Sequence, residues 1–231
     1  MQKIILASTS KVHGQTYLSY LMDTLKVHFK GIDEILFIPY ARPGGINYEE
    51  YTAVVKTAFH EIGKKIKGIH EFDDPKKALK KAQAFFTGGG NTFVLLNTLC
   101  NYDLLDILAA EVRNGKPYLG TSAGSNIAGQ NIKNTNDMPI VYPPSYRAMG
   151  LIPFNINPHF LDPILNSTHM GETRETRINE YLVFNSIPVI GLREGSWIEV
   201  AGSEIYLKGP HTARWFQQGK EAEEILPGKI S

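Results

Sequence analysis

The stretch Lys116-Pro-Tyr-Leu-Gly-Thr-Ser-Ala-Gly124 joins a short apolar run to a Gly-x-Ser-x-Gly turn. Lys116–Gly120 is expected to form a strand, and the small residues of Ser125–Gly129 are suited to begin a helix. A tight turn between a strand and a helix lifts the Ser122 hydroxyl above the edge of a sheet, where the glycines leave room for close backbone approach. The motif therefore predicts a nucleophilic serine. A glycine-rich turn in which Ser122 only caps a helix is the alternative.

Outside this stretch, short apolar runs alternate with longer segments in which apolar residues recur at helical spacing. The expected strands are Ile4–Ala7, Glu34–Pro39, Ala84–Thr87, Lys116–Gly120 and Pro188–Gly191. The clearest helical segments are Thr16–Lys30 and Tyr48–Ile62. This alternation is typical of parallel strands joined by helices. We therefore expect an α/β fold, one domain over residues 1–231, with a mostly parallel sheet and helices on both of its faces.

The C-terminal part of the chain has a different pattern. Its short segments are separated by turns that contain glycine, and they are Ser196–Ala201, Glu204–Leu207 and Arg214–Gln217. Short segments joined in this way predict an antiparallel ribbon that extends the parallel sheet.

The composition excludes several classes of protein. Among 231 residues, 24 Lys and Arg face 23 Asp and Glu, so no overall field draws the chain to nucleic acid or to an anionic membrane. The single cysteine, Cys100, cannot form an internal disulfide or a multi-thiolate zinc site. No apolar run reaches the length of a signal-peptide core or a membrane span. We expect a soluble cytoplasmic protein without nucleic-acid or membrane partners; its oligomeric state is not predicted.

Two lysine clusters could in principle contact phosphates. They comprise Lys64, Lys65 and Lys67, followed by Lys76, Lys77, Lys80 and Lys81. Acidic residues lie close by in the sequence and no aromatic residues alternate with the lysines, so we interpret both clusters as solvated helix faces.

A second glycine-rich turn, Gly88-Gly-Gly-Asn91, also follows an expected strand and precedes a helix. Backbone N–H groups at such a turn can point into a pocket beside the positive end of a helix dipole. The turn lacks the lysine of a phosphate-binding loop and the spacing of a dinucleotide fingerprint. It predicts an oxyanion hole with one N–H from Gly89 or Gly90 and a second from Ala123.

A serine nucleophile requires a base and a carboxylate that orients the base. His159 is the preferred base because it ends the strand-like segment Leu151–His159, while His169 and His211 remain possible. The candidate carboxylates are Asp137 and Glu194. We favour Glu194, because it follows an expected parallel strand, whereas Asp137 can instead hold a loop over the site.

Two other kinds of chemistry have weaker support. His159, Asp162, His169 and Glu172 lie close together in the sequence, but their spacing matches no helical metal-binding arrangement. Cys100 lies at an expected helix end, with neither a strand-to-helix turn nor a base nearby. We therefore expect no metal and no cofactor.

Six segments together resemble peptidase E, the α-aspartyl dipeptidase family of serine peptidases, whose fold is similar to that of class I glutamine amidotransferases. They are Gly88–Phe93, Gly120–Gly124, Thr135–Ile140, Ile156–Phe160, Gly171–Arg174 and Gly191–Trp197. The resemblance implies a nucleophile at Ser122, a base at His159 and a third member at Asp137 or Glu194. It also implies a small peptide substrate with N-terminal aspartate.

The resemblance further implies that Arg174, before the helix expected over Arg174–Phe184, pairs with the aspartate side chain of the substrate, and that Asn91 contributes to substrate binding. One departure is Thr121, where some relatives have tryptophan. Cyanophycin-degrading enzymes share the Ser122 turn and are one alternative. An α/β-hydrolase esterase is another, although Ser122 and Asp137 are too close in sequence for that fold. A non-catalytic binding module is the third, but neither the turn nor the base is missing.

Overall fold

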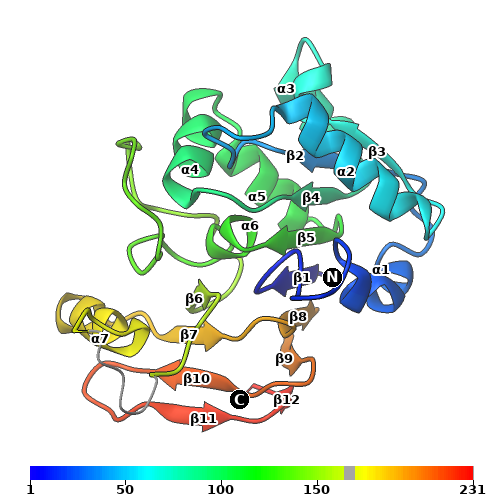
Figure 1. Ribbon diagram of the computed structural model, residues 1–231. Helices are drawn as coiled ribbons and strands as arrows, with labels where there is room; N and C mark the ends of the chain where they lie inside the picture. The colour runs from blue at the N-terminus through cyan, green and yellow to red at the C-terminus, as the bar shows by residue number, and fades with distance from the viewer. Residues whose placement is uncertain (164–169, 231) are drawn as a thin grey trace.

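The computed structural model describes residues 1–163 and 170–230, and Figure 1 shows how the elements are arranged. The strands are β1 (Lys3–Ala7), β2 (Glu34–Ile38), β3 (Lys65–Gly68), β4 (Phe85–Thr87), β5 (Tyr118–Thr121), β6 (Asn155–Pro158), β7 (Val189–Leu192), β8 (Trp197–Ala201), β9 (Glu204–Lys208), β10 (Ala213–Phe216), β11 (Glu223–Ile225) and β12 (Gly228–Lys229). The α-helices are α1 (Met22–His28), α2 (Tyr48–His60), α3 (Pro75–Lys81), α4 (Thr92–Asn101), α5 (Leu105–Arg113), α6 (Ala123–Asn126) and α7 (Arg174–Phe184).

The larger sheet has eight strands in the order β12-β9-β8-β1-β5-β4-β2-β3. The strands from β1 to β3 in this order are parallel, whereas β8, β9 and β12 extend the sheet beyond β1 in antiparallel pairs. The prediction of a mostly parallel α/β sheet is therefore confirmed. Because all parallel strands end at one edge, the turns that follow β1, β2, β4 and β5 meet there.

A second sheet of four strands, in the order β11-β10-β7-β6, was not expected from the sequence. Within it β6 and β7 are parallel, and β10 pairs antiparallel with β7. The prediction that Arg214–Gln217 continues the ribbon of β8 and β9 is therefore wrong. Period-2 patterns identify strands, but they do not specify which strand becomes the neighbour.

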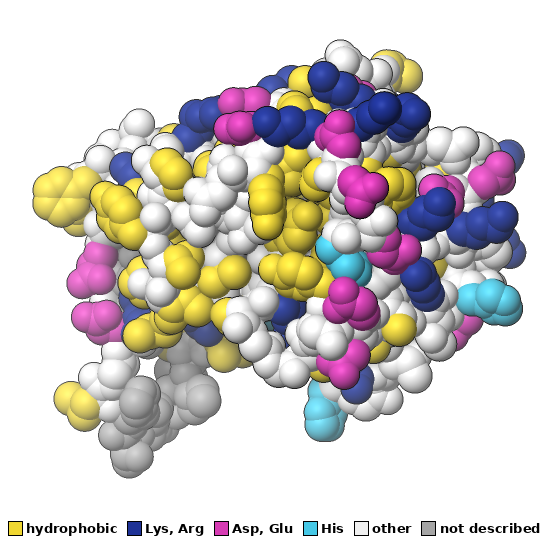
Figure 2. All heavy atoms as spheres, turned by 90° about the horizontal axis from the view of Figure 1, so that it is seen from above, with side chains coloured by type: hydrophobic (Ala, Val, Ile, Leu, Met, Phe, Trp, Pro, Cys, Tyr) yellow, Lys and Arg dark blue, Asp and Glu magenta, His cyan; other side chains and the backbone are white. Residues whose placement is uncertain are grey.

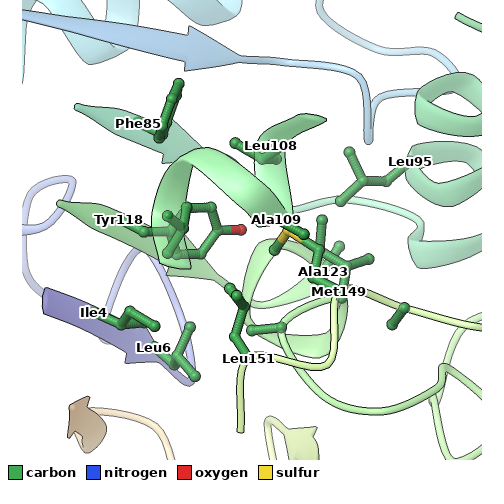
Figure 3. Packing of buried hydrophobic residues seen from close by; sticks show 14 of the residues in the cluster. Ile4, Leu6, Phe85, Leu95, Leu108, Ala109, Tyr118, Ala123, Met149 and Leu151 are labelled. Atoms are coloured by element: carbon green, nitrogen blue, oxygen red, sulfur yellow. The ribbon is translucent and has the colours of Figure 1, made fainter. Parts of the chain in front are cut away.

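Helices cover both faces of the larger sheet because alternate side chains of its strands point to opposite sides. Ile4 and Leu6 pack with α4, α5 and α6 in one cluster, while Ile5 and Ala7 pack with α1 and α2 in another. Figure 3 shows the first cluster, in which Tyr118 of β5 lies among side chains from β1 and the helices. The Gly120–Gly124 turn thus follows a strand, β5, that is buried on both faces.

Two local expectations need correction. Within Thr16–Lys30 a 3-10 turn and the shorter helix α1 begin only after Leu18, because its left-handed conformation, with φ of 57°, cannot be part of a right-handed helix. Lys65 and Lys67 lie on β3, not on a helix, and they alternate with buried residues along this edge strand. The lysines of Pro75–Lys81 do lie on a helix, α3.

Charges of both signs cover this part of the surface. Lys67 lies 3.8 Å from Glu34, and Lys76 lies 2.8 Å from Asp103. Figure 2 shows Lys and Arg side chains interspersed with Asp and Glu side chains on the face seen from above. Acidic groups therefore lie next to some of these lysines, as the interpretation of a solvated surface predicts.

Within residues 1–163 and 170–230, no single helix is long and apolar enough to cross a membrane. The neighbouring helices α4 and α5 reach that length only together, with a bend of 94° at the break between them.

Candidate active site

Ser122 occupies the turn between β5 and α6 in a strained backbone conformation. Its φ is 51° and its ψ is −111°, in the left-handed half of conformational space that residues with a side chain rarely adopt. The turn is tight: a Cβ on Gly120 would lie 2.5 Å from the Gly124 carbonyl oxygen, and Gly124 packs directly on the backbone of Thr87. Both glycines of the motif are therefore required by close contacts.

Hydrogen bonds from buried neighbours keep this turn in place. The Ser122 N–H donates to the Ala7 carbonyl at 3.1 Å. The Ser125 hydroxyl lies within hydrogen-bond distance of two carbonyl oxygens, those of Ala7 at 2.7 Å and Gly120 at 2.9 Å. Sequence reasoning placed Ser125 only among small residues at a helix start and missed this supporting role. These hydrogen bonds hold the backbone of Ser122 in its strained conformation.

The structure brings Ser122, His159 and Glu194 together in one hydrogen-bonded row. His159 Nε2 lies 2.9 Å from Ser122 Oγ, and His159 Nδ1 lies 2.6 Å from Glu194 Oε1. His159 follows β6 and Glu194 follows β7, the parallel neighbours of the second sheet. A carboxylate on Nδ1 favours the tautomer that leaves Nε2 as the acceptor for a serine proton.

Ser8, at the end of β1, connects the two strands that position these side chains. Its hydroxyl donates to the Leu192 carbonyl at 2.7 Å and accepts the His159 backbone N–H at 2.9 Å. Ser8 is fully buried, and His159 has a φ of 52°. The hydroxyl therefore holds His159 in a backbone conformation that fixes the direction of its ring.

Replacing Ser8 with alanine should lower kcat by about tenfold while KM changes little, because the His159 N–H loses its acceptor and the His159 ring loses its fixed position. Ser122 should also react more slowly with a serine-directed phosphonylating reagent, measured well below the melting temperature. Thr9→Ala is the matched control, since the Thr9 hydroxyl bonds only to Lys11 nearby. Equal effects of the two substitutions would contradict the positioning role.

Asp137 and Asn91 support the start of α4 and do not contact His159. The Asp137 carboxylate accepts hydrogen bonds from the Thr92 N–H at 2.7 Å and the Thr92 hydroxyl at 2.5 Å. The Asn91 side chain accepts from the Val94 N–H and donates to the Met138 carbonyl. Of the two predicted carboxylates, only Glu194 reaches the histidine. The oxygen of the Asn91 amide and one of its N–H groups are thus engaged within the protein, and its contribution to substrate binding stays a prediction.

The backbone around the glycine turn narrows the choice of oxyanion donors. The Gly89 N–H donates to the Tyr51 hydroxyl at 3.0 Å, so this N–H is already used. Neither the Gly90 N–H nor the Ala123 N–H has an acceptor within the described residues. Gly90 has a φ of 146°, which suits glycine alone. The available N–H groups therefore favour Gly90 and Ala123 over Gly89 as the pair of donors, which stays a prediction.

Arg174 begins α7, where the sequence predicted a helix with the same bounds. It is partly buried, and burial is the main reason why the pKa of its guanidinium is lowered, with the nearby Asp137 acting in the opposite direction. Among the described residues it makes neither a hydrogen bond nor an ion pair. Arg174 is thus a partly desolvated cation on the α4 side of the Ser122 turn.

The remaining candidates do not take part in the described row of hydrogen bonds from Ser122 to Glu194. His169 is outside the described residues, and the His211 ring makes no hydrogen bond to Ser122. Within residues 1–163 and 170–230, no three His, Cys, Asp or Glu side chains form a metal-binding group. Asp162 instead pairs with Arg193 at 2.7 Å. Burial raises the pKa of the Cys100 thiol, which makes it a poor nucleophile.

Comparison with known proteins finds similar sequences among peptidases. The family described as "Peptidase family S51" matches residues 4–208. Peptidase E of Streptomyces coelicolor is 45% identical over 225 residues, which is 97% of this chain and 91% of that protein. The probable alpha-aspartyl dipeptidase of Drosophila melanogaster is 43% identical over 229 residues, 98% of this chain and 94% of the relative.

Solved structures are similar in fold at low sequence identity. A peptidase from an acI-B1 Actinobacterium superposes with a TM-score of 0.75 at 19% identity, covering 100% of this chain and 97% of the other. A putative peptidase E protein from Listeria monocytogenes gives a TM-score of 0.69 at 22% identity, covering 91% and 99%.

Proposed function

The chain belongs to peptidase family S51, and from this premise we propose that it is a serine dipeptidase, which hydrolyses dipeptides with N-terminal aspartate through an acyl-enzyme on Ser122. The observation that carries the proposal is the row of hydrogen bonds from Ser122 through His159 to Glu194 at a strained strand-to-helix turn. This arrangement has the three roles that acyl transfer requires: a nucleophile, a base and a group that orients the base.

The reaction proceeds in two similar halves. His159 Nε2 takes the Ser122 proton as the oxygen attacks the carbonyl carbon that follows aspartate. His159 then gives this proton to the leaving amine, and the C–N bond breaks to leave the acyl-enzyme. Water attacks next and gives a proton to His159, which passes it to the Ser122 oxygen as the ester bond breaks, so that aspartate is released and Ser122 regains its hydroxyl.

The two remaining contributions are electrostatic. Glu194 accepts a hydrogen bond from His159 Nδ1 and stabilises the imidazolium that forms in each half-reaction. The N–H groups of Gly90 and Ala123 stabilise the negative oxygen of the tetrahedral intermediate. Both groups are held in place before the reaction, by β7 and by the turns after β4 and β5.

Arg174 supplies the charge that selects aspartate. A guanidinium group binds a carboxylate through two parallel hydrogen bonds, which a neutral side chain of similar size cannot form. The partial burial of Arg174 strengthens this preference, because water competes less there than at an exposed site.

Arg174→Met should lower kcat/KM for Asp-Leu by a factor on the order of 10² or more, since a partly buried substrate carboxylate would lose its partner. Hydrolysis of Asn-Leu, where measurable, should change far less. Arg177→Met on the same helix is the matched control, because Arg177 pairs with Glu172 at the surface. Equal losses on Asp-Leu and Asn-Leu would show that Arg174 supports the fold or the chemistry instead of specificity.

The proposal as a whole is tested by incubating the purified protein with Asp-Leu, Leu-Leu and a short-chain ester. Hydrolysis of Asp-Leu in clear preference to Leu-Leu supports the aspartyl dipeptidase. Efficient hydrolysis of the ester alone would favour an esterase. No hydrolysis of any of the three would favour a non-catalytic binding module.

We assign the fold, a single domain over residues 1–231, to the class I glutamine amidotransferase-like group. The position of the Ser122 turn after a central parallel strand, with the base supplied from outside the larger sheet, supports this assignment. A small peptide is the proposed partner, without nucleic acid or membrane, because the formal charge is +1 and no basic stripe is formed. The lone cysteine supports a cytoplasmic location.

A further inference from the structure

Arg42 is a charged side chain near the active site that the mechanism has not used. It lies in the loop after β2, at the same edge of the sheet as the turns that carry Ser122 and Gly90. Its guanidinium carbon lies 4.6 Å from the centre of the Tyr51 ring. Contact with the face of the buried Tyr51 ring restricts the position of the guanidinium group.

A short series of contacts connects Arg42 with the nucleophile. The Tyr51 hydroxyl accepts the Gly89 N–H at 3.0 Å. The position that a Cβ on Gly89 would take lies 3.0 Å from Ser122 Cβ. One aromatic side chain and one backbone turn therefore separate Arg42 from Ser122.

Arg42 and Arg174 lie on different sides of this turn. Arg42 packs on Tyr51 of α2, in the layer of helices α1 and α2. Arg174 lies at the start of α7, where the charge of Asp137 acts to raise the pKa of its guanidinium. Asp137 is itself bound to the start of α4. In Figure 1, β5 and α6 lie between α2 and α7.

The arginine contacts show that Arg42 lacks an internal partner. Arg147 pairs with Asp106, and Arg193 pairs with Asp162 and Glu224. Within the described part of the chain, Arg42 and Arg174 are the two arginines that form neither a hydrogen bond nor an ion pair. Arg42 Nε is buried and has no acceptor. The Arg42 side chain as a whole is only partly buried, so its uncompensated charge is available to an anion that arrives with the substrate.

The neighbouring Tyr17 contributes a neutral polar group. Its hydroxyl lies 3.4 Å from that of Tyr51, and burial raises its pKa well above the usual range. Because Tyr17 therefore keeps its proton, it adds no negative charge that would compete for Arg42. The groups beside Arg42 are thus an aromatic ring and neutral hydroxyls.

A dipeptide with N-terminal aspartate carries two carboxylates, one on the aspartate side chain and one at the C-terminus. We propose that Arg42 binds the C-terminal carboxylate of the residue that leaves, while Arg174 binds the aspartate side chain. This inference rests on the proposed function. Two guanidinium groups on different sides of Ser122 match the two charges on either side of the scissile bond. Arg42 then restricts the enzyme to substrates whose chain ends directly after the leaving residue.

The test compares Asp-Leu with Asp-Leu amide, which differ only in the charge at the C-terminus. The wild-type enzyme should have a kcat/KM for Asp-Leu that is higher by a factor on the order of 10 to 100, as expected for hydrogen bonds to a charged group. Arg42→Met should reduce this ratio towards 1 through a loss on Asp-Leu and a much smaller change on the amide. Arg42→Lys, which keeps the charge but loses the paired N–H groups, should give an intermediate ratio.

Arg147→Met is the matched control, because this exposed arginine pairs with Asp106 far from the site, and it should leave the ratio unchanged. Thermal midpoints of all variants establish that each is folded. Equal hydrolysis of both substrates by the wild type, or equal losses on both substrates in Arg42→Met, would overturn the assignment of Arg42 while the dipeptidase stands. Failure of the wild type to hydrolyse either substrate would instead overturn the proposed function, and the role of Arg42 with it.

Discussion

Ser122→Ala should abolish hydrolysis of dipeptides with N-terminal aspartate, lowering kcat by a factor on the order of 10⁴ or more. The reason is chemical, because His159 Nε2 lies 2.9 Å from Ser122 Oγ and bonds to no other hydroxyl or thiol among the residues that the structure describes. The fold should persist, since the change removes one oxygen from a partly exposed turn and creates no cavity in the core. The measurements are kcat and KM on Asp-Leu and the thermal midpoint.

A phosphonylating reagent supplies an independent check. It should label the wild-type protein at Ser122 and fail to label Ser122→Ala. Ser125→Ala is a poor control despite its closeness, because the Ser125 hydroxyl supports the turn through Ala7 and Gly120. Thr9→Ala is a better one. Retention of most of the wild-type kcat in Ser122→Ala would refute the assignment of the nucleophile.

Glu194→Gln should lower kcat by a factor on the order of 10² to 10⁴ with little change in the thermal midpoint. Glu194 accepts the Nδ1 proton of His159 at 2.6 Å, whereas a glutamine amide can donate to that nitrogen instead. Donation to Nδ1 favours the tautomer that carries its proton on Nε2, and this tautomer cannot accept the proton of Ser122.

Asp137→Asn is the comparison that separates the two carboxylates. Asp137 accepts hydrogen bonds from the Thr92 N–H and hydroxyl at the start of α4, where a negative charge interacts favourably with the helix dipole. Its substitution should lower the thermal midpoint and leave kcat within a few-fold of the wild type. A large loss of kcat in Asp137→Asn alone would reverse the assignment of the carboxylate that orients His159.

Local features of the fold were predictable. The glycines around Ser122 and the asparagine before α4 are signals that span a few residues, and the structure places turns at both. The helix Arg174–Phe184 and most strands of the larger sheet also lie where the sequence predicts them. These predictions succeed because turn geometry and side-chain periodicity depend mainly on neighbouring residues.

The pairing of strands was not predictable in the same way. Pro188–Gly191 and Arg214–Gln217 both have the pattern of strands, but together they form part of a second sheet that the sequence did not indicate. The edge strand β3 was missed because its lysines alternate with buried residues over only four positions. Such short segments are compatible with more than one neighbour, and packing against the rest of the chain selects among them.

The sequence by itself determined the nucleophile turn, the glycine turn beside it and the identity of the candidate base, because these depend on residue types at short spacing. Only the tertiary structure decided that Glu194 and not Asp137 contacts His159, that Ser8 links β6 with β7, and that Arg42 has no partner among the described residues. These contacts join side chains from distant parts of the chain. Their hydrogen bonds and burial depend on which strands lie side by side, and no pattern along the sequence records that arrangement.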